Sequence, residues 1–241
     1  MNNTVNVNSK YKGNEALILN GKELPYTMLH YWQANLSEIL LNVNRGGFAE
    51  FIVQSAMHAG GFDTFDKIMT GMEEYDLDGP EIKALHRRSK IEVKSAAAVQ
   101  YDTPEDKDLS GYSHSKLNFS IRSHYKVEED KEKDKDKDKA ENKDKKQKEK
   151  RLPRNNDLYV FCHYTATKKS DNMLDMKNWD FYVYPTYKIE ENADISEQKT
   201  ISLTRIEELE IPKQSFEMLY REILRVVDEI SEHCREKATS S

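Results

Sequence analysis

The chain has 241 residues, of which 33% are charged and 37% hydrophobic, and its formal net charge is −6. A strongly charged run at residues 126–151 holds 12 of the 37 basic and 10 of the 43 acidic residues, which leaves 25 basic and 33 acidic residues and a net charge of −8 elsewhere. Proteins that coat nucleic acid without sequence preference are usually basic, so this balance argues against that class. The remaining length suits one modest α/β domain, and two domains would be crowded.

Several other protein classes lack support in the sequence. The two cysteines, Cys162 and Cys234, stand in no zinc-ligand spacing, and none of the seven histidines belongs to an HxxxH pair. Neither of the common phosphate-binding glycine motifs occurs. The chain begins without a basic, then apolar, leader, and no stretch approaches the roughly 18 apolar residues of a membrane span. We therefore expect a soluble protein of the reducing cytoplasm with no membrane partner.

The N-terminal quarter of the sequence predicts a tail and two helices. Residues 1–20 are polar and rich in asparagine, so we expect a flexible tail ahead of a single domain over residues 21–235. Apolar residues recur at helical spacing from Tyr26 and predict an amphipathic helix that ends before residues 44–47, where two glycines are expected to turn the chain. A second helix over residues 48–59 is nearly apolar on every side.

Glu50 is the only acidic residue of that second helix. A carboxylate in a largely buried helix needs a cation, a metal ion or several hydrogen-bond donors. Glu50 and Gln54 lie one helical turn apart, which suits a polar stripe directed at a site. The alternative is a structural ion pair between Glu50 and Arg45 or another basic group.

Short strands are expected after the second helix, first near residues 75–77 and then over residues 91–95. In the next apolar run, alternation places one set of side chains toward the core, namely Leu117, Phe119 and Ile121, and the other set on an open side, namely Asn118, Ser120 and Arg122. We expect the open set to line a groove.

The second half of the chain begins with a low-complexity run. Residues 126–151 have almost nothing to bury, so we expect a disordered charged insertion or a solvated helix without a chemical role. Strands over residues 158–164 and 179–184 and a helix over residues 215–233 follow. Together these elements predict the α/β class, with a central mixed sheet flanked by helices.

The pattern that carries chemistry consists of Asp76 and the segment at residues 91–95, Ile-Glu-Val-Lys-Ser. In a strand, Glu92 and Lys94 emerge together on the side opposite the core. A second carboxylate from Asp76 would complete a hard oxygen site for Mg²⁺, with a lysine placed to meet a water or a phosphate. Such a constellation suits hydrolysis of a phosphodiester, although an acidic residue upstream of Glu-x-Lys also arises by chance in highly charged chains.

In the order of these motifs the chain resembles the PD-(D/E)xK nuclease superfamily, also called restriction-endonuclease-like, and within it a group of bacterial members. The similar segments cover most of residues 24–225. No proline precedes Asp76, and residues 79–90 and 126–151 look like insertions. The matching motifs are Arg45-Gly46-Gly47-Phe48-Ala49-Glu50, Tyr75-Asp76-Leu77, Ile91-Glu92-Val93-Lys94-Ser95-Ala96 and Gln100.

The resemblance implies a restriction-endonuclease-like fold and an endonuclease that uses Mg²⁺, or Mn²⁺ as a substitute, on nucleic acid, with DNA as the expected substrate, in restriction, defence or repair. Asp76, Glu92 and the backbone carbonyl of Val93 would hold the metal, and Lys94 would orient or activate the attacking water. Glu50 would be an accessory acid. Substrate would be positioned by Gln100 and contacted by Ser95, Lys116, Asn118, Ser120 and Arg122.

A second hypothesis belongs to another class. The same fold can serve as a noncatalytic module that binds nucleic acid or protein, with Glu92 and Lys94 as a surface ion pair worth about 0–1 kcal/mol. Stabilisation by divalent metal would separate the two hypotheses. The sequence leaves open whether the substrate is DNA or RNA, which bases are read, and whether two copies pair as a homodimer.

Overall fold

The computed structural model describes residues 12–62, 75–127 and 149–240. The first part of the expected N-terminal tail, residues 1–11, and most of the expected charged insertion, residues 128–148, lie outside this range. Within the described residues, no helix is both long and apolar enough to cross a membrane.

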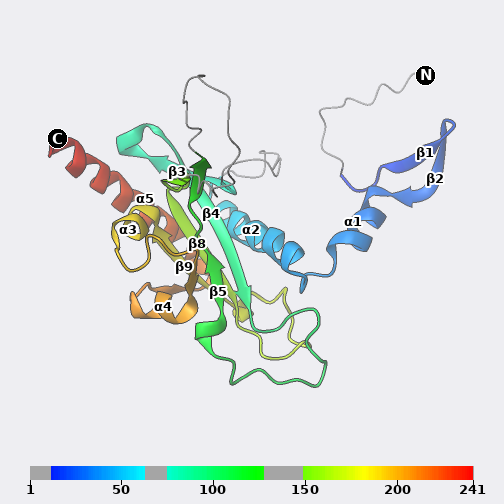
Figure 1. Cartoon of the computed structure of the whole chain (residues 1–241). Coiled ribbons are helices and arrows are strands. Elements are labelled where there is room, and N and C mark those ends of the chain that lie inside the picture. The colour runs from blue at the N-terminus through cyan, green and yellow to red at the C-terminus, as the bar shows by residue number, and fades with distance from the viewer. Residues whose placement is uncertain (1–11, 63–74, 128–148, 241) are drawn as a thin grey trace, which may run out of the picture.

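A five-stranded mixed sheet forms the centre of the molecule (Figure 1). The strand order is β11-β9-β8-β4-β3, in which β4 and β8 are parallel and the other neighbours are antiparallel. The predicted strands at residues 91–95, 158–164 and 179–184 are confirmed. The strands span Leu77–Ile82 (β3), Arg87–Ala97 (β4), Leu158–Tyr164 (β8), Trp179–Pro185 (β9) and Lys213–Gln214 (β11).

Two long helices, α2 (Asn42–Ala59) and α5 (Phe216–Thr239), pack on one face of the sheet. The face that they cover carries alternate residues of each strand, because successive side chains of a strand point to opposite faces. Ile91 and Val93 of β4 accordingly belong to the same apolar cluster as the helices. The predicted helix at residues 215–233 is confirmed and extends six residues further.

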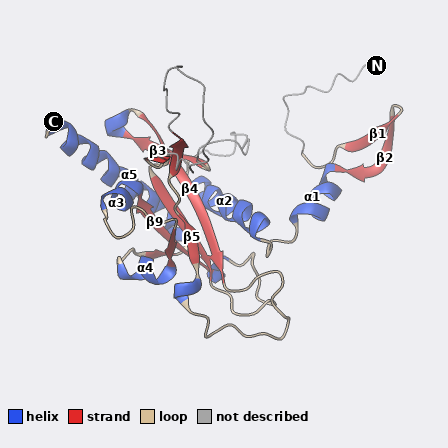
Figure 2. Ribbon diagram, viewed as in Figure 1, coloured by secondary structure: helices blue, strands red, loops and turns tan. Residues whose placement is uncertain are grey.

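The opposite face is covered by short elements that form a second apolar cluster, including Phe119, Phe161 and Ile206. Figure 2 shows β5 beside β4, with α4 on the same side of the sheet. The alternation predicted for residues 117–122 is confirmed, with the odd-numbered residues buried and the even-numbered ones exposed. These elements are β5 (Asn118–Ser120), which pairs with β10 (Thr200–Ser202), α3 (Thr186–Glu191) and α4 (Leu203–Glu208).

The N-terminal predictions were wrong in detail. The end of the expected tail forms β1 (Ala16–Leu19), which pairs in a hairpin with β2 (Lys22–Thr27), and Tyr26 therefore lies in a strand. The helix α1 (Met28–Leu36) begins only after Thr27, whose backbone N–H donates to the His30 ring. Hairpin and α1 project from one end of α2 in Figure 1. A capping interaction at Thr27 decided this boundary, which apolar spacing alone does not reveal.

Helix α2 also begins earlier than predicted, at Asn42, so that Gly46 and Gly47 lie inside it rather than in a turn. A glycine in a helix costs about 1 kcal/mol relative to alanine. Burial of the α2 residues Ala49, Ile52 and Val53 in the main core more than offsets that cost. The helix is also less completely buried than predicted, since the apolar side chain of Phe51 is 53% exposed.

Two segments expected to be insertions contribute to sheets. Residues 79–90 supply most of β3, the short helix η1 (Lys83–Leu85) and the start of β4, and together they make an antiparallel hairpin. At the ends of the charged run, β6 (His124–Val127) pairs with β7 (Glu149–Leu152). Arg151, the last residue of the charged run, is ordered in β7 because it forms ion pairs with Glu190 at 2.5 Å and Glu197 at 2.9 Å. Both partners are distant in the sequence, so local sequence does not predict these ion pairs.

Candidate functional site

The candidate site lies where β4 continues beyond the end of β3. Strand β3 begins at Leu77, which pairs with Ile91, so Asp76 lies immediately before the start of the strand. The Asp76 backbone N–H donates to the Ile91 carbonyl at 3.0 Å, and its carboxylate Oδ2 accepts the Val93 N–H at 2.7 Å. These two bonds hold the Asp76 carboxylate against the backbone of β4.

Two carboxylates and one ammonium meet at this point. Lys94 Nζ lies 3.5 Å from Asp76 Oδ2 and is also ion-paired with Glu92 Oε1. The three side chains are between 20% and 28% exposed, so solvent screens them only in part. Burial disfavours the ammonium, but Asp76 and Glu92 outweigh that effect and raise the pKa of Lys94 above its ordinary value. Lys94 therefore stays protonated at neutral pH.

Glu50 enters the same electrostatic environment from helix α2. Burial, followed by the charges of Asp76 and Glu92, raises the pKa of Glu50 to about 7, while Lys94 acts in the opposite direction. The structural pairing with Arg45 is not observed, because Arg45 bonds to Asn42 and Gln100 instead. Glu50 is thus a partly buried carboxyl that becomes charged near neutral pH beside two other carboxylates.

The donor set fits a hard divalent cation in its chemistry. Three carboxylates against one ammonium leave a surplus of negative charge, and carboxylate oxygens are the ligands that Mg²⁺ prefers. As the side chains stand, no group of three or more acidic, histidine or cysteine residues in the described chain is placed to hold a metal ion. Asp76 and Glu92 converge on the Lys94 ammonium, so the cation between them is at present a side chain.

A groove runs beside Lys94 along the uncovered edge of β4, with a volume of about 390 Å³. Four of the five predicted substrate contacts line it, as do Gln100 and Arg45, while Arg122 is exposed outside it. Arg122 is excluded because the chain leaves β5 after Ser120. We call this cavity the Lys94 groove, and its lining is Asn42, Arg45, Lys94, Ser95, Ala96, Ala97, Gln100, Tyr112, Lys116, Leu117, Asn118 and Ser120.

Gln100 is held by the protein at both ends of its amide. Its Nε2 donates to the Ala97 carbonyl at 2.6 Å, and its Oε1 accepts from Arg45 Nη1 at 3.1 Å. Gln100 therefore orients Arg45 as well as lining the groove. Sequence reasoning assigned Arg45 no role in the site. A basic residue next to a mostly apolar helix could have suggested a role for Arg45, but the direction of its side chain depends on where α2 begins.

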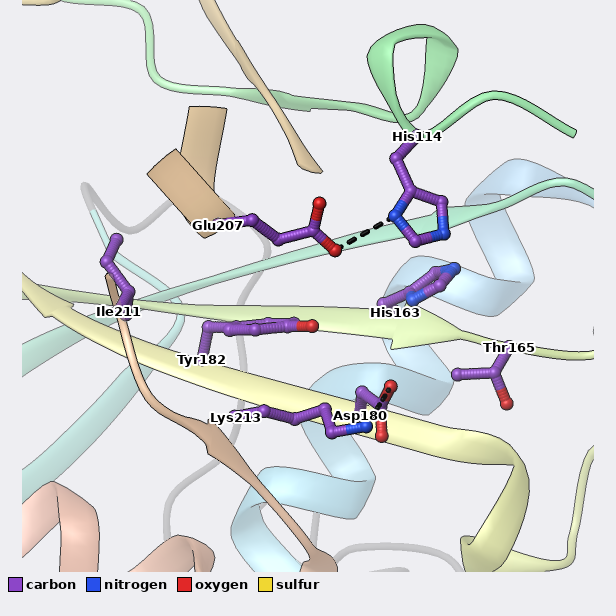
Figure 3. A pocket seen from close by; sticks show the side chains of 8 residues that line it. All are labelled: His114, His163, Thr165, Asp180, Tyr182, Glu207, Ile211 and Lys213. Carbon is purple, nitrogen blue, oxygen red and sulfur yellow. Dashed lines mark hydrogen bonds and ion pairs between the residues drawn. The ribbon is translucent and has the colours of Figure 1, made fainter. Parts of the chain in front are cut away.

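A second cavity, of about 500 Å³, lies on the same face of the sheet (Figure 3). In Figure 3, His114 points toward Glu207, with a distance of 2.9 Å from Nδ1 to Oε1, and His163 lies beneath His114. His163 in this cavity pairs in register with Ala96, which lines the Lys94 groove. His114 of the cavity lies between Tyr112 and Lys116 of the groove in the sequence, so the two cavities are neighbours. His163 is 7% exposed, and its Nδ1 has no hydrogen-bond partner among the described residues.

The buried imidazole predicts a loss of stability in acid. Burial, with a smaller contribution from His114, lowers the pKa of His163 to about 4, whereas an unfolded histidine titrates near 6.5. The unfolded chain therefore binds the extra proton first, and stability falls as the pH drops from 6.5 toward 4. At pH 5 this costs about 2 kcal/mol relative to pH 7.5.

Urea unfolding of His163→Asn at the two pH values should show that much less acid sensitivity than the unaltered protein. His86→Asn is the matched control, because His86 is exposed and its left-handed backbone, with φ 51°, suits asparagine. Equal acid sensitivity in His163→Asn and the unaltered protein would refute the assignment.

Comparison with protein-family models, with curated proteins and with solved structures found no match to this chain. The function must therefore be argued from the geometry of the site.

Proposed function

We propose that the protein is a metal-dependent nuclease that hydrolyses phosphodiester bonds, with DNA as its expected substrate. The observation that carries the proposal is the meeting of Asp76, Glu92 and Lys94 at an open sheet edge beside a groove. Asp76 is separated from the other two by fifteen or more residues, and it reaches them through specific backbone hydrogen bonds. A mere surface ion pair does not require such anchoring.

The arrangement of the sheet supports a restriction-endonuclease-like fold. Asp76 stands at the start of one strand, Glu92 and Lys94 lie on the antiparallel neighbour, and the next strand is parallel. A helix that precedes these strands contributes Glu50, in the order that the sequence motifs led us to expect. The order of the motifs along these elements supports the proposed fold, and the activity is argued from the site itself.

Asp76 and Glu92 would hold a divalent metal ion, together with the carbonyl of Val93. The Val93 N–H points to Asp76. Because one residue of an extended strand directs its N–H and C=O to the same side, the Val93 carbonyl faces the Asp76 side as well. When bound, the metal would supply Lewis acidity and a more acidic water. Glu50, with a pKa of about 7, is suited to exchange a proton near neutral pH.

Lys94 has the properties of a charge donor rather than of a base. Its raised pKa keeps the ammonium protonated, so it would donate hydrogen bonds to a phosphate oxygen or orient a water beside the two carboxylates. Lys116 and Arg45 place two further positive charges in the Lys94 groove. This local lining would attract a phosphate backbone even though the chain as a whole is acidic.

One observation favours the alternative of a noncatalytic binding module. The carboxylates of Asp76 and Glu92 already have a cation, the Lys94 ammonium, and a stable ion-paired cluster needs no metal. In that case divalent ions would leave the protein unchanged.

Metal titration followed by thermal unfolding separates the two functions. A nuclease should be stabilised by Mn²⁺ and by Mg²⁺, by about 2.7 kcal/mol at a concentration 100 times Kd, because only the folded chain holds the ligands together. It should also cleave at least one member of a panel of labelled single-stranded, duplex and branched DNA and RNA.

Asp76→Asn should lose both the stabilisation and the cleavage. Asp228→Asn is the matched control, since Asp228 is an exposed carboxylate that pairs with Lys83 on the surface. Absence of any metal effect, together with an uncut panel, would reject the nuclease and leave the binding module.

A further inference from the structure

Arg45 is a buried cation without a counter-charge among the described residues. The residue is 5% exposed, yet no carboxylate of the described chain lies within 4.0 Å of its guanidinium. Its hydrogen-bond partners are two neutral oxygens, Asn42 Oδ1 at 2.6 Å and Gln100 Oε1 at 3.1 Å. The Nε atom is enclosed and has no partner. Burial without a compensating charge lowers the pKa of Arg45.

The other buried arginine of the molecule shows how a structural guanidinium is treated. The Arg154 side chain is 1% exposed, and its Nη1 contacts Glu190 Oε1 at 2.7 Å. Its remaining donors reach the carbonyls of Ile121 at 2.7 Å and Ser196 at 3.0 Å. Arg154 is therefore neutralised and satisfied by the protein. Buried charges in proteins are normally paired, so the unneutralised Arg45 points to a partner outside the described residues.

The surroundings of Arg45 favour an anion as that partner. Arg45 lines the Lys94 groove, which also contains the ammonium groups of Lys94 and Lys116 and the polar side chains of Asn118 and Ser120. Arg45 lies in the first turn of the 18-residue helix α2, whose N-terminal end adds partial positive charge. Asn42 and Gln100 hold the guanidinium plane from two sides and leave two terminal N–H groups for a ligand.

We infer that Arg45 forms a phosphate-binding subsite in the Lys94 groove, which takes a non-scissile phosphate of the bound strand. A planar guanidinium that is already oriented suits the two oxygens of a phosphate. Lys116, at the exposed side of the groove, adds a weaker and less directional contact. The identification of the ligand as nucleic acid rests on the proposed function, whereas the affinity of Arg45 for phosphate does not.

The test measures binding without cleavage. A fluorescent single-stranded oligonucleotide is titrated in excess chelator over a range of salt concentrations, so that no metal-dependent reaction takes place. Arg45→Met should weaken binding at least tenfold and should lower the slope of log Kd against log salt by about 1, as expected for one lost phosphate contact. Arg45→Lys keeps the charge but loses the oriented fork, so it should retain the slope with an intermediate affinity.

Arg205→Met is the matched control, because Arg205 is a surface residue paired with Asp194 and Glu208. It should bind as the unaltered protein does. Lys116→Ala should reduce the slope without removing a buried group, and Arg45→Lys keeps the test decisive if Arg45→Met does not fold. Oligonucleotides with a 5′-phosphate and with a 5′-hydroxyl distinguish the sources of the phosphate. An Arg45 effect on the first alone assigns a terminal phosphate, and an equal effect on both assigns an internal one.

The inference is overturned if the Arg45 variants bind with the affinity and slope of Arg205→Met. Failure of the proposed function gives a different result. If the Arg45 variants weaken binding but the unaltered protein cuts nothing with Mg²⁺ or Mn²⁺, the subsite stands on a binding module. If the protein cleaves and the Arg45 variants bind normally, the nuclease stands and the subsite is rejected.

Discussion

Replacement of Lys94 by alanine is expected to lower phosphodiester cleavage by about 10²–10³-fold while leaving Mn²⁺ affinity equal or tighter. The Lys94 ammonium contacts both Asp76 and Glu92, so it competes electrostatically with a divalent ion for the same carboxylates. Its removal frees ligands for the metal and at the same time removes the positive charge beside the reacting phosphate. Single-turnover cleavage and Mn²⁺ calorimetry on the same preparation measure the two effects.

The companion variant Glu92→Gln should fail in a different way. It removes an anionic oxygen ligand, so Mn²⁺ affinity and cleavage should fall together. The exposed pair of Lys83 in η1 and Asp228 in α5 supplies matched controls. Lys83→Ala removes one positive charge, as Lys94→Ala does, and Asp228→Asn removes one negative charge, as Glu92→Gln does. If Lys94→Ala and Glu92→Gln are both indistinguishable from these controls in metal binding and in cleavage, the nuclease proposal is wrong.

Glu50→Gln is expected to stabilise the protein at alkaline pH while it lowers activity. Glu50 has a pKa of about 7 in the folded protein against 4.5 as its ordinary value, so the folded chain binds the proton more tightly. Stability is therefore lost as the pH rises from 4.5 through 7, because the carboxyl must ionise in a partly buried, already negative site. Glutamine removes this cost, which we place at about 1–2 kcal/mol after allowance for solvent screening.

Urea unfolding at pH 5 and at pH 8 tests the sign of the effect. The gain in stability of Glu50→Gln should be present at pH 8 and nearly absent at pH 5, while cleavage at pH 8 should be reduced. Glu105→Gln serves as the control, since Glu105 is largely exposed and pairs with Lys169 on the surface. A variant that is less stable at both pH values and fully active would show that Glu50 is structural.

Local sequence was sufficient to predict several parts of the structure. The strands at residues 158–164 and 179–184 are apolar and bounded by breaking residues, so their burial in the sheet follows from composition. The period of two in a strand also placed Glu92 and Lys94 on one side of β4, opposite the buried residues Ile91 and Val93. These features depend on alternation, which holds wherever a strand forms.

Only the tertiary structure decided which distant residues meet. The hairpin of residues 79–90 brings Asp76 to the backbone of Val93, although that segment looks like an insertion in the sequence. The early start of α2 turns Arg45 into the Lys94 groove and away from Glu50. Helix starts and hairpin pairings depend on caps and long-range hydrogen bonds of about 1 kcal/mol each, and these are comparable to the local preferences that they override. Periodicity can therefore predict which face a side chain occupies, whereas its partners emerge only when the chain is packed.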